Sequence, residues 1–243
     1  MKSNRSQFLT AEWRYLAMLN YEVDPAVLTP FIPKGTELDR WNGKTLISVV
    51  GFLFQNARIG RFSVPFHRNF EEVNLRFYVK RLSNNEWRRA VVFIKELVPR
   101  WAIAWTARNI YNENYVSLPM GHHILVDTDG AFSGVSYEWK LKGRRNCLEL
   151  LVKAQAAFAQ EGSQEEFITE HYWGYARQRD GGTLEYQVEH PKWRVWPVHS
   201  ARLDCDVRAH YGEGFVRYLE NPPTSAFLAE GSAVAVLKGK RIT

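Results

Sequence analysis

Hydrophobic and polar residues alternate strictly along residues 69–79. A period of two is typical of a β-strand, because successive side chains point to opposite faces. One face of the predicted strand is apolar and carries Val73, Leu75, Phe77 and Val79. The other face carries Glu72, Asn74, Arg76 and Tyr78. On an open sheet this polar row faces water, whereas on a sheet that curls into a barrel it lines a cavity and is a candidate binding site.

Turn-forming dipeptides separate most of the other apolar segments. They are Asn42-Gly43, Asn84-Asn85, Asp129-Gly130 and Gly181-Gly182. Besides residues 69–79, the predicted strands are 37–41, 46–54, 89–98, 124–127, 132–141, 173–178, 184–190, 193–209 and 226–237. Turns that recur so often favour an antiparallel meander, sandwich or barrel over alternating βαβ units.

Few segments carry the signals of a helix. The predicted helices are residues 25–31 after the cap Asp24, 100–112 with one apolar face, 163–171 opened by a capping box, and 212–219. Residues 148–160 fit both periods, and we predict a strand in their first half. No internal repeat or long linker divides the chain, so we expect one β-rich α+β domain over residues 1–243.

The charge of the chain gives little indication of a macromolecular partner. Lys and Arg number 32 against 26 Asp and Glu, a formal charge of +6, and the basic residues are scattered. The densest basic patch, residues 140–145, contains Gly143 and is either a solvated hairpin tip or a phosphate-binding site. Aromatic residues make up 14% of the chain but are not interleaved with Lys and Arg, so we expect no nucleic-acid partner.

The two cysteines, Cys147 and Cys205, are too few for a disulfide framework. Glu12 and Arg14 interrupt the apolar run near the N-terminus, which argues against a secretory signal. No run approaches the roughly 18 apolar residues that span a bilayer. We therefore expect a cytoplasmic protein with no membrane partner, and a homo-oligomer is compatible with this expectation.

Lys95 and Glu96 are adjacent charges within the apolar residues 91–98. A strand sends neighbouring side chains to opposite faces, so at least one charge is expected in an apolar environment, which is costly unless it is paired. Burial lowers the pKa of a lysine, and a nearby Arg76 would lower it further. A neutral lysine can attack a carbonyl to form a Schiff base. Alternatively, Lys95 or Glu96 belongs to a structural ion pair with Arg76, Arg100 or Arg108.

The histidines have no spacing that indicates a metal site. His122 and His123 are neighbours, so on a strand they face opposite ways. The remaining histidines lack the His-x-x-x-His spacing of a helical metal site. No nucleophile elbow, phosphate-binding loop or dinucleotide fingerprint occurs either. We therefore expect no metal and no cofactor.

Residues spread over nearly the whole chain resemble a known family. They are Trp13, Leu16, Val23-Asp24-Pro25, Leu28, Pro33, Phe70, Glu72, Asn74, Arg76, Tyr78, Val79, Ala107-Arg108, Glu166 to Glu170, Tyr172, His190-Pro191 and Trp193. In their order they resemble the YqjF-like family of uncharacterised bacterial proteins, whose fold is similar to that of acetoacetate decarboxylase. The resemblance implies a large, strongly bent antiparallel β-barrel or cone with a few peripheral helices and an internal cavity. A cavity makes the polar row a binding site for a small molecule.

The resemblance does not extend to the catalytic lysine pair of acetoacetate decarboxylase. Acetoacetate decarboxylase looks like a Schiff-base enzyme whose reactive lysine is activated by an adjacent lysine. No Lys-Lys pair occurs in this chain. Lys95 is preceded by Ile94 and followed by Glu96. Decarboxylation of acetoacetate by that route is therefore not expected.

Two hypotheses follow for the polar row. In the first, the protein is an enzyme, of lyase type, that acts on a small carbonyl or carboxylate compound. Arg76, helped by Arg100, would hold the carboxylate, and Asn74 and Tyr78 would orient the substrate. Glu72 or Glu96 would be the general acid or base, and Lys95 the nucleophile. In the second hypothesis, the same residues form a non-catalytic site for a small apolar anion. Lys95 turned inward beside Glu72 and Arg76 would favour the first.

Overall fold

The structure is a computed structural model and describes residues 6–60, 68–99 and 114–242. The helix predicted over residues 100–112, and with it Arg100, lies outside the described residues. Strands dominate: β1 Gln7–Glu22, β2 Glu37–Leu38, β3 Leu46–Ile59, β4 Phe70–Ser83, β5 Glu86–Val98, β6 Tyr115–Ser117, β7 Met120–Val126, β8 Phe132–Leu141, β9 Arg144–Val152, β10 Ala157–Phe158, β11 Trp173–Arg177, β12 Thr183–Glu189, β13 Arg194–Asp204, β14 Ser225–Leu237 and β15 Lys240–Arg241. The helices are η1 Pro25–Phe31, α2 Gln164–Thr169, α3 Val207–Tyr211 and α4 Glu213–Leu219.

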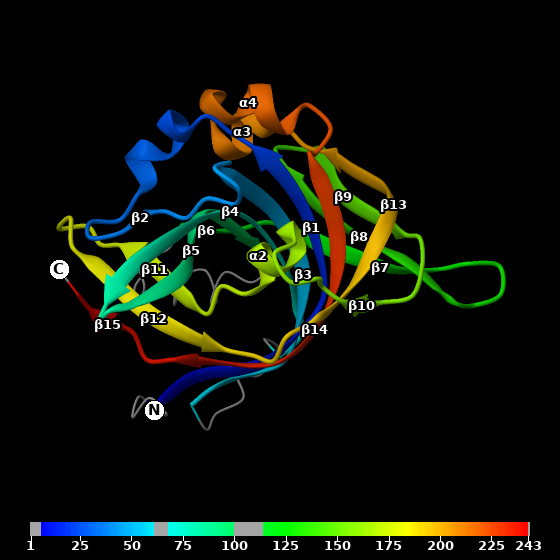
Figure 1. Cartoon of the computed structure of the whole chain (residues 1–243). Coiled ribbons are helices and arrows are strands. Elements are labelled where there is room, and N and C mark those ends of the chain that lie inside the picture. The colour runs from blue at the N-terminus through cyan, green and yellow to red at the C-terminus, as the bar shows by residue number, and fades with distance from the viewer. Residues whose placement is uncertain (1–5, 61–67, 100–113, 243) are drawn as a thin grey trace.

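The strands form one strongly bent sheet, as predicted. Its order is β15-β12-β11-β5-β4-β3-β1-β14-β13-β9-β8-β7, and β12 also pairs with β14. That last pairing joins β12, β11, β5, β4, β3, β1 and β14 into a ring, which Figure 1 shows around the middle of the molecule. Strands β13, β9, β8 and β7 leave the ring as a wing, because β13 pairs with β14 at one end and with β9 at the other. Pairings are antiparallel except where β5 meets β6 and β11.

The hairpin between β4 and β5 follows the predicted turn. Asn84 and Asn85 both have positive φ, 53° and 61°, a conformation that Asn tolerates better than most residues. The Asn42-Gly43 turn closes only an isolated bridge between Trp41 and Lys44. Asn42-Gly43 is a typical hairpin signal, but residues 37–41 form no hairpin with 46–54, because β2 pairs with β4 instead.

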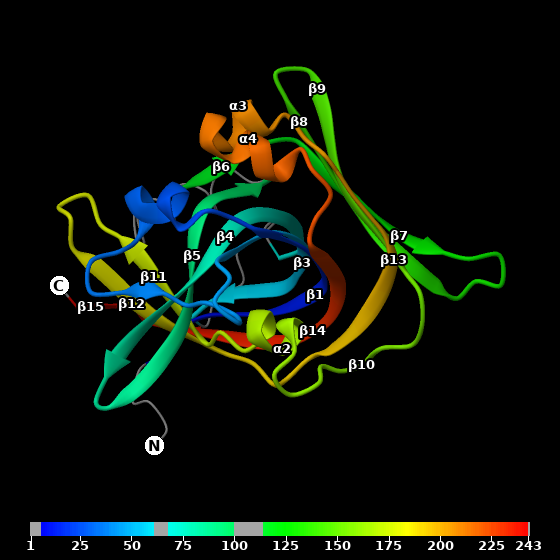
Figure 2. The ribbon, with the colours of Figure 1, turned by 45° about the horizontal axis from the view of Figure 1, so that its top comes forward.

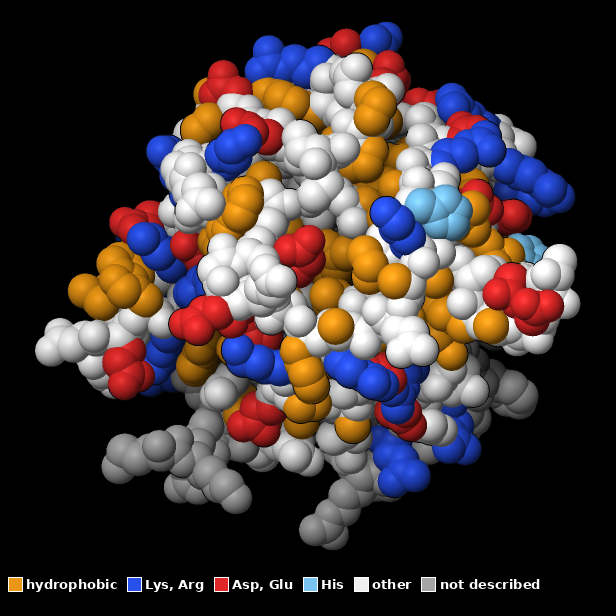
Figure 3. Space-filling model, turned by 45° about the vertical axis from the view of Figure 1, so that its right-hand side comes forward, with side chains coloured by type: hydrophobic (Ala, Val, Ile, Leu, Met, Phe, Trp, Pro, Cys, Tyr) orange, Lys and Arg blue, Asp and Glu red, His pale blue; other side chains and the backbone are white. Residues whose placement is uncertain are grey.

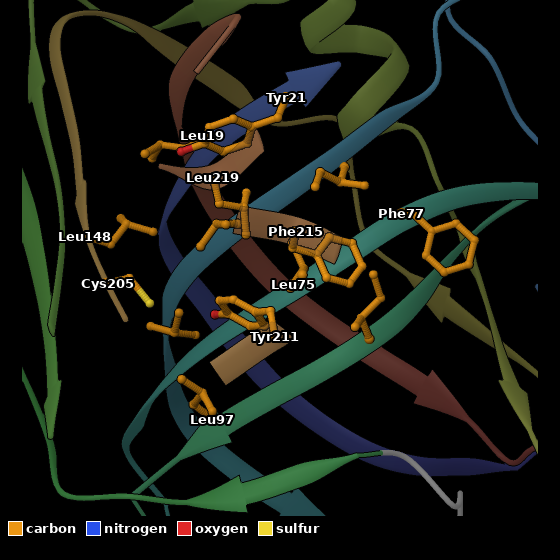
Figure 4. Close-up of a cluster of buried hydrophobic side chains, with 14 of the residues drawn as sticks. Leu19, Tyr21, Leu75, Phe77, Leu97, Leu148, Cys205, Tyr211, Phe215 and Leu219 are labelled. Atoms are coloured by element: carbon orange, nitrogen blue, oxygen red, sulfur yellow. The ribbon is translucent and has the colours of Figure 1, made fainter. Parts of the chain in front are cut away.

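Strand β4 is buried on both faces. Val73, Leu75, Phe77 and Val79 are fully buried. They belong to a cluster with residues of α3 and α4. Figure 4 shows Leu75 and Leu97 of the sheet near Tyr211 and Phe215 of the helices. We call this side of the ring the outer face. The inner face packs against Phe167 and Ile168 of α2, which lies in the opening of the ring in Figures 1 and 2.

Caps set the ends of the helices. Asp24 accepts a hydrogen bond from the backbone N–H of Ala26 at the start of η1, and Ser163 accepts one from Glu166 at the start of α2. The strand predicted over residues 193–209 ends at Asp204. It ends early because the Asp206 side chain accepts from the N–H of Ala209 and opens α3.

Acidic and basic side chains are interspersed over the face that Figure 3 shows. This arrangement agrees with the scattered charges of the sequence. The basic patch of residues 140–145 lies at the turn between β8 and β9, as predicted. No helix of the described ranges is long and apolar enough to cross a membrane.

Candidate functional site

The polar row of β4 is buried on the inner face rather than exposed to water. Glu72, Asn74 and Tyr78 are 2%, 1% and 1% exposed, and Arg76 is 9% exposed. Tyr78 belongs to the inner apolar cluster together with Met18, Phe52 and residues of α2. Of the two interpretations of the row, the solvent-facing one is therefore wrong, and the four polar side chains lie inside the ring.

Arg76 is a buried guanidinium without a counter-ion in the part of the chain that the structure describes. Its Nη2 lies 3.8 Å from Sδ of Met18, and its Cζ lies 5.7 Å from the centre of the Tyr78 ring. Its Nε has no hydrogen-bond partner among the described residues. An unpaired buried charge is costly. A group that retains such a charge is well suited to hold an anion, because the anion would remove that cost.

Two buried carboxyl groups lie farther along the same face. Glu72 Oε1 accepts a hydrogen bond from Nδ2 of Asn74 at 2.9 Å, and Glu72 Oε2 accepts one from the hydroxyl of Tyr115 at 3.3 Å. Glu96, only 1% exposed, is the register partner of Asn74 on β5. Glu72 and Glu96 are thus diagonal neighbours, a relation that places Cα atoms about 7–8 Å apart. The structure brings these predicted site residues together with Arg76.

A β-bulge decides the faces of Lys95 and Glu96. Leu75 pairs with Lys95 but Arg76 pairs with Phe93, so Ile94 is an extra residue in β5. Lys95 therefore shares the outer face with Leu75, while Glu96 joins the polar row. The ammonium of Lys95 donates a hydrogen bond to the carbonyl oxygen of His210 in α3. Burial lowers the pKa of Lys95 as predicted, but the sheet separates this lysine from Glu72 and Arg76.

Tyr78 takes part in a buried chain of hydrogen bonds. Ser48 Oγ donates to Oδ1 of Asn20 at 2.6 Å, so its single proton is used. The Tyr78 hydroxyl, 2.6 Å from the same Oγ, must then be the donor. Asn20 Nδ2 continues the chain to Ser225, whose hydroxyl donates to Gln164 of α2. The predicted orienting role of Tyr78 is thereby limited to accepting a hydrogen bond or to packing.

Another buried ionisable group lies beside the polar row of β4, and the sequence alone did not identify it as a site residue. His171, which follows α2, has its ring centre 4.7 Å from that of Tyr78. Its Nε2 lies 3.2 Å from Oδ2 of Asp39, which also accepts from Nε of Arg89 at 2.7 Å. His171 and Asp39 are 132 residues apart. No local spacing could have indicated their contact.

Burial sets the protonation of His171, and hydrogen bonds set that of Asp39. Desolvation lowers the pKa of His171 to about 4, against the opposing effect of the Asp39 hydrogen bond. The charges of Arg89 and Arg76 lower this pKa further. Desolvation acts to raise the pKa of Asp39, but hydrogen bonds from His171 and Arg89 outweigh it and the pKa is lowered. At neutral pH the pair is a neutral imidazole beside a carboxylate.

A further histidine, His190, lies in an aromatic stack. The ring of His190 stacks on Trp193 with centroids 4.1 Å apart and lies 4.7 Å from Tyr172. Desolvation lowers the pKa of His190, and the charge of Arg76 contributes in the same direction. Among the described residues no group of His, Cys, Asp or Glu side chains could hold a metal ion.

The fold defined by this ring and its inner face is that of acetoacetate decarboxylase-like enzymes. The enduracididine biosynthesis enzyme MppR, complexed with pyruvate, superposes with a TM-score of 0.67 at 13% identity, covering 100% of this chain and 92% of MppR. Acetoacetate decarboxylase from Legionella pneumophila gives a TM-score of 0.67 at 12% identity, covering 100% and 92% of the two chains. At such identities the likeness shows the fold alone.

The sequence comparisons are more specific. The profile of the family DUF2071, described as "Uncharacterized conserved protein", matches residues 10–233. This chain belongs to that family. The "Uncharacterized protein YqjF" of Bacillus subtilis (strain 168) is 37% identical over 68 residues. That alignment spans 28% of this chain and 28% of the relative.

Proposed function

We propose that the inner face of the ring binds a small carboxylate compound through Arg76 and acts on its carbonyl group. The observation that carries this proposal is the buried guanidinium of Arg76, which lacks an ion pair within the described residues. A planar guanidinium matches a carboxylate with two parallel hydrogen bonds. The anion would therefore satisfy both the charge of Arg76 and its Nε donor.

The neighbouring carboxyl groups support chemistry at the ligand. Glu72 and Glu96 lie on adjacent strands next to Asn74, and Oδ1 of Asn74 has no partner in the described chain. A protonated carboxyl group at this place would donate to a carbonyl oxygen, and an ionised one would accept a proton. MppR, which has a similar fold, forms a complex with pyruvate. This similarity of fold supports a small keto acid as the ligand.

The second candidate function is binding without catalysis. It is favoured by the position of Lys95, which lies on the outer face and cannot form a Schiff base with a ligand held at Arg76. The two functions share the site and differ in the fate of the ligand. Incubation of the protein with a bound keto acid, followed by NMR of the solution, separates them.

The proposal is tested by thermal unfolding with matched ligands. Pyruvate, acetoacetate and phenylpyruvate are compared with their methyl esters, at constant ionic strength, in the wild type, Arg76→Met and Arg194→Met. Arg194 is the control because it is half-exposed and already paired with Glu230. A ligand at about 100 times its Kd stabilises the fold by about 2.7 kcal/mol.

We expect stabilisation by at least one acid and by no ester. The effect should be lost in Arg76→Met and retained in Arg194→Met. Equal stabilisation by acid and ester, or an undiminished effect in Arg76→Met, would contradict the proposal.

A further inference from the structure

The contact with Asp39 fixes the tautomer of His171. A carboxylate can only accept a hydrogen bond, so Nε2 of His171, 3.2 Å from Oδ2 of Asp39, carries the proton. Arg89 is also only a donor, so its 3.5 Å contact with the same nitrogen is not a hydrogen bond in this state. The neutral imidazole therefore has its lone pair on Nδ1.

That lone pair has no partner in the described ranges of the chain. Nδ1 of His171 is buried and accepts no hydrogen bond from any described residue, although buried acceptors are nearly always satisfied. The arrangement is the one by which a carboxylate orients an imidazole and stabilises its protonated form. A purely structural histidine would gain nothing from an unsatisfied Nδ1.

His171 lies beside the site of the proposed function. Its ring packs against Tyr78, the same ring that the guanidinium of Arg76 approaches. Phe167 of α2 contacts His171 with ring centres 5.1 Å apart, and His171 is buried, at 6% exposed. A bound carboxylate would neutralise Arg76, whose charge disfavours a proton on His171. Ligand binding and the basicity of His171 are thus coupled.

We propose that His171 is the base that removes a proton from the carbon next to the carbonyl of a carboxylate ligand held by Arg76. The inference rests on the proposed function. The C–H bond breaks, the proton goes to Nδ1, and the electron pair moves to the carbonyl oxygen to give an enolate. Asp39 then stabilises the imidazolium. Return of a proton from His171 regenerates the ketone, so the step is reversible and requires no oxidant or reductant.

The experiment is deuterium exchange of the methyl hydrogens of pyruvate in D2O, followed by proton NMR. The variants are His171→Gln, Asp39→Asn and the control His199→Gln, since His199 is exposed and bonds only to the carbonyl of Val152 among the described residues. Pyruvate affinity is measured for each by calorimetric titration. Folding is checked by circular dichroism.

Wild type and His199→Gln should exchange pyruvate hydrogens faster than buffer alone. His171→Gln should lose about 100-fold or more of that rate, the usual contribution of a general base, with affinity unchanged within about threefold. Asp39→Asn retains the imidazole but removes the group that orients it, so its rate should fall less. If His171→Gln does not fold, the exchange rate of Asp39→Asn tests the proposal instead, and a rate equal to that of the wild type would contradict it.

Failure of the two proposals can be distinguished. Absence of binding of pyruvate, acetoacetate and phenylpyruvate alike by the wild type would contradict the proposed function. Binding without exchange, or exchange at the wild-type rate in folded His171→Gln, would overturn the role of His171 while leaving carboxylate binding at Arg76 intact.

Discussion

Lys95 and Glu96 are neighbours in β5, yet their side chains lie on opposite sides of the ring. Lys95 contacts the carbonyl oxygen of His210 on the outer face, and Glu96 pairs with Asn74 on the inner face. The bulge at Ile94 sets this arrangement, because it places Glu96 rather than Lys95 in line with the polar row. Among the described residues, the groups near a ligand held at Arg76, as we propose, would therefore be carboxyl, amide and imidazole groups rather than the amine of Lys95.

Lys95→Ala should leave carboxylate binding unchanged and should not alter covalent trapping. After incubation with pyruvate and borohydride, intact-mass spectrometry should show no adduct that depends on Lys95. Loss of one hydrogen bond to the carbonyl of His210 should cost about 1 kcal/mol of unfolding free energy. Lys44→Ala is the control, since Lys44 is an exposed partner of Glu22. An adduct in wild type and Lys44→Ala that disappears in Lys95→Ala would contradict this account.

Arg76→Met should raise the unfolding free energy while it abolishes carboxylate binding. The substitution replaces an unpaired buried cation by an apolar side chain of similar length, which should stabilise the protein by about 1–2 kcal/mol. Urea denaturation in the absence of ligand measures the change. If Arg76 were instead a structural residue, the variant would be destabilised by more than about 1 kcal/mol.

Glu185→Gln should be strongly destabilising. Glu185 is 1% exposed and accepts from Arg88 at 2.6 Å and from the Tyr175 hydroxyl at 3.1 Å. Removing one partner of a buried ion pair costs about 3–5 kcal/mol, and the partial exposure of Arg88 places the expected loss at the lower end. Glu230→Gln, in the half-exposed pair with Arg194, should cost less than about 1 kcal/mol. Equal urea midpoints for the two variants would be inconsistent with the buried network.

Gly231→Ala should destabilise the ring where β14 meets β1. Gly231 has a φ of +80°, and a Cβ there would lie 2.0 Å from the carbonyl oxygen of Trp13. We expect a loss of more than about 3 kcal/mol, because backbone strain and a clash with backbone add. Gly43 has a similar φ of +78° with nothing within 4 Å. Gly43→Ala should therefore cost only about 1 kcal/mol, and similar losses in both variants would refute the clash.

The unfolding free energy should fall as the pH is lowered from about 6.5 to about 4. The pKa of an unperturbed histidine is 6.5, and that of His171 in the folded protein is about 4. Between these two pH values the unfolded chain therefore binds more protons than the folded protein. The contribution of His171 to the unfolding free energy is thus fully present above pH 6.5. It is lost as the pH falls toward 4, by on the order of 3 kcal/mol. His210, whose pKa burial also lowers to about 4, acts in the same direction. Urea titrations at several pH values should give a flatter profile for His171→Gln than for wild type, and parallel profiles would contradict the assignment.

Local patterns predicted much of the fold. The alternation in residues 69–79 became β4, and Asn84-Asn85 became its hairpin turn, because both depend on neighbours in the chain. The alternation also grouped Glu72, Asn74 and Arg76 on one face. The family resemblance then indicated that this face would be enclosed.

The remaining features depend on distant parts of the chain. The bulge at Ile94 has no sequence signal of its own, and it reverses the face expected to carry a reactive Lys95. The pairing of β2 with β4 joins segments far apart in the chain, so the local Asn42-Gly43 signal could not indicate it. His171 reaches Asp39 only because α2 lies inside the ring. A buried charge that no described residue pairs with, as in Arg76, becomes visible only once the fold is known.

The most direct test of the account is a crystal structure of the wild-type protein with pyruvate at a saturating concentration. We predict the pyruvate carboxylate on the inner face, within hydrogen-bond distance of the Arg76 guanidinium, with its methyl group toward His171. Pyruvate bound at Lys95 under α3, or at any place that leaves Arg76 without an anion, would contradict the account.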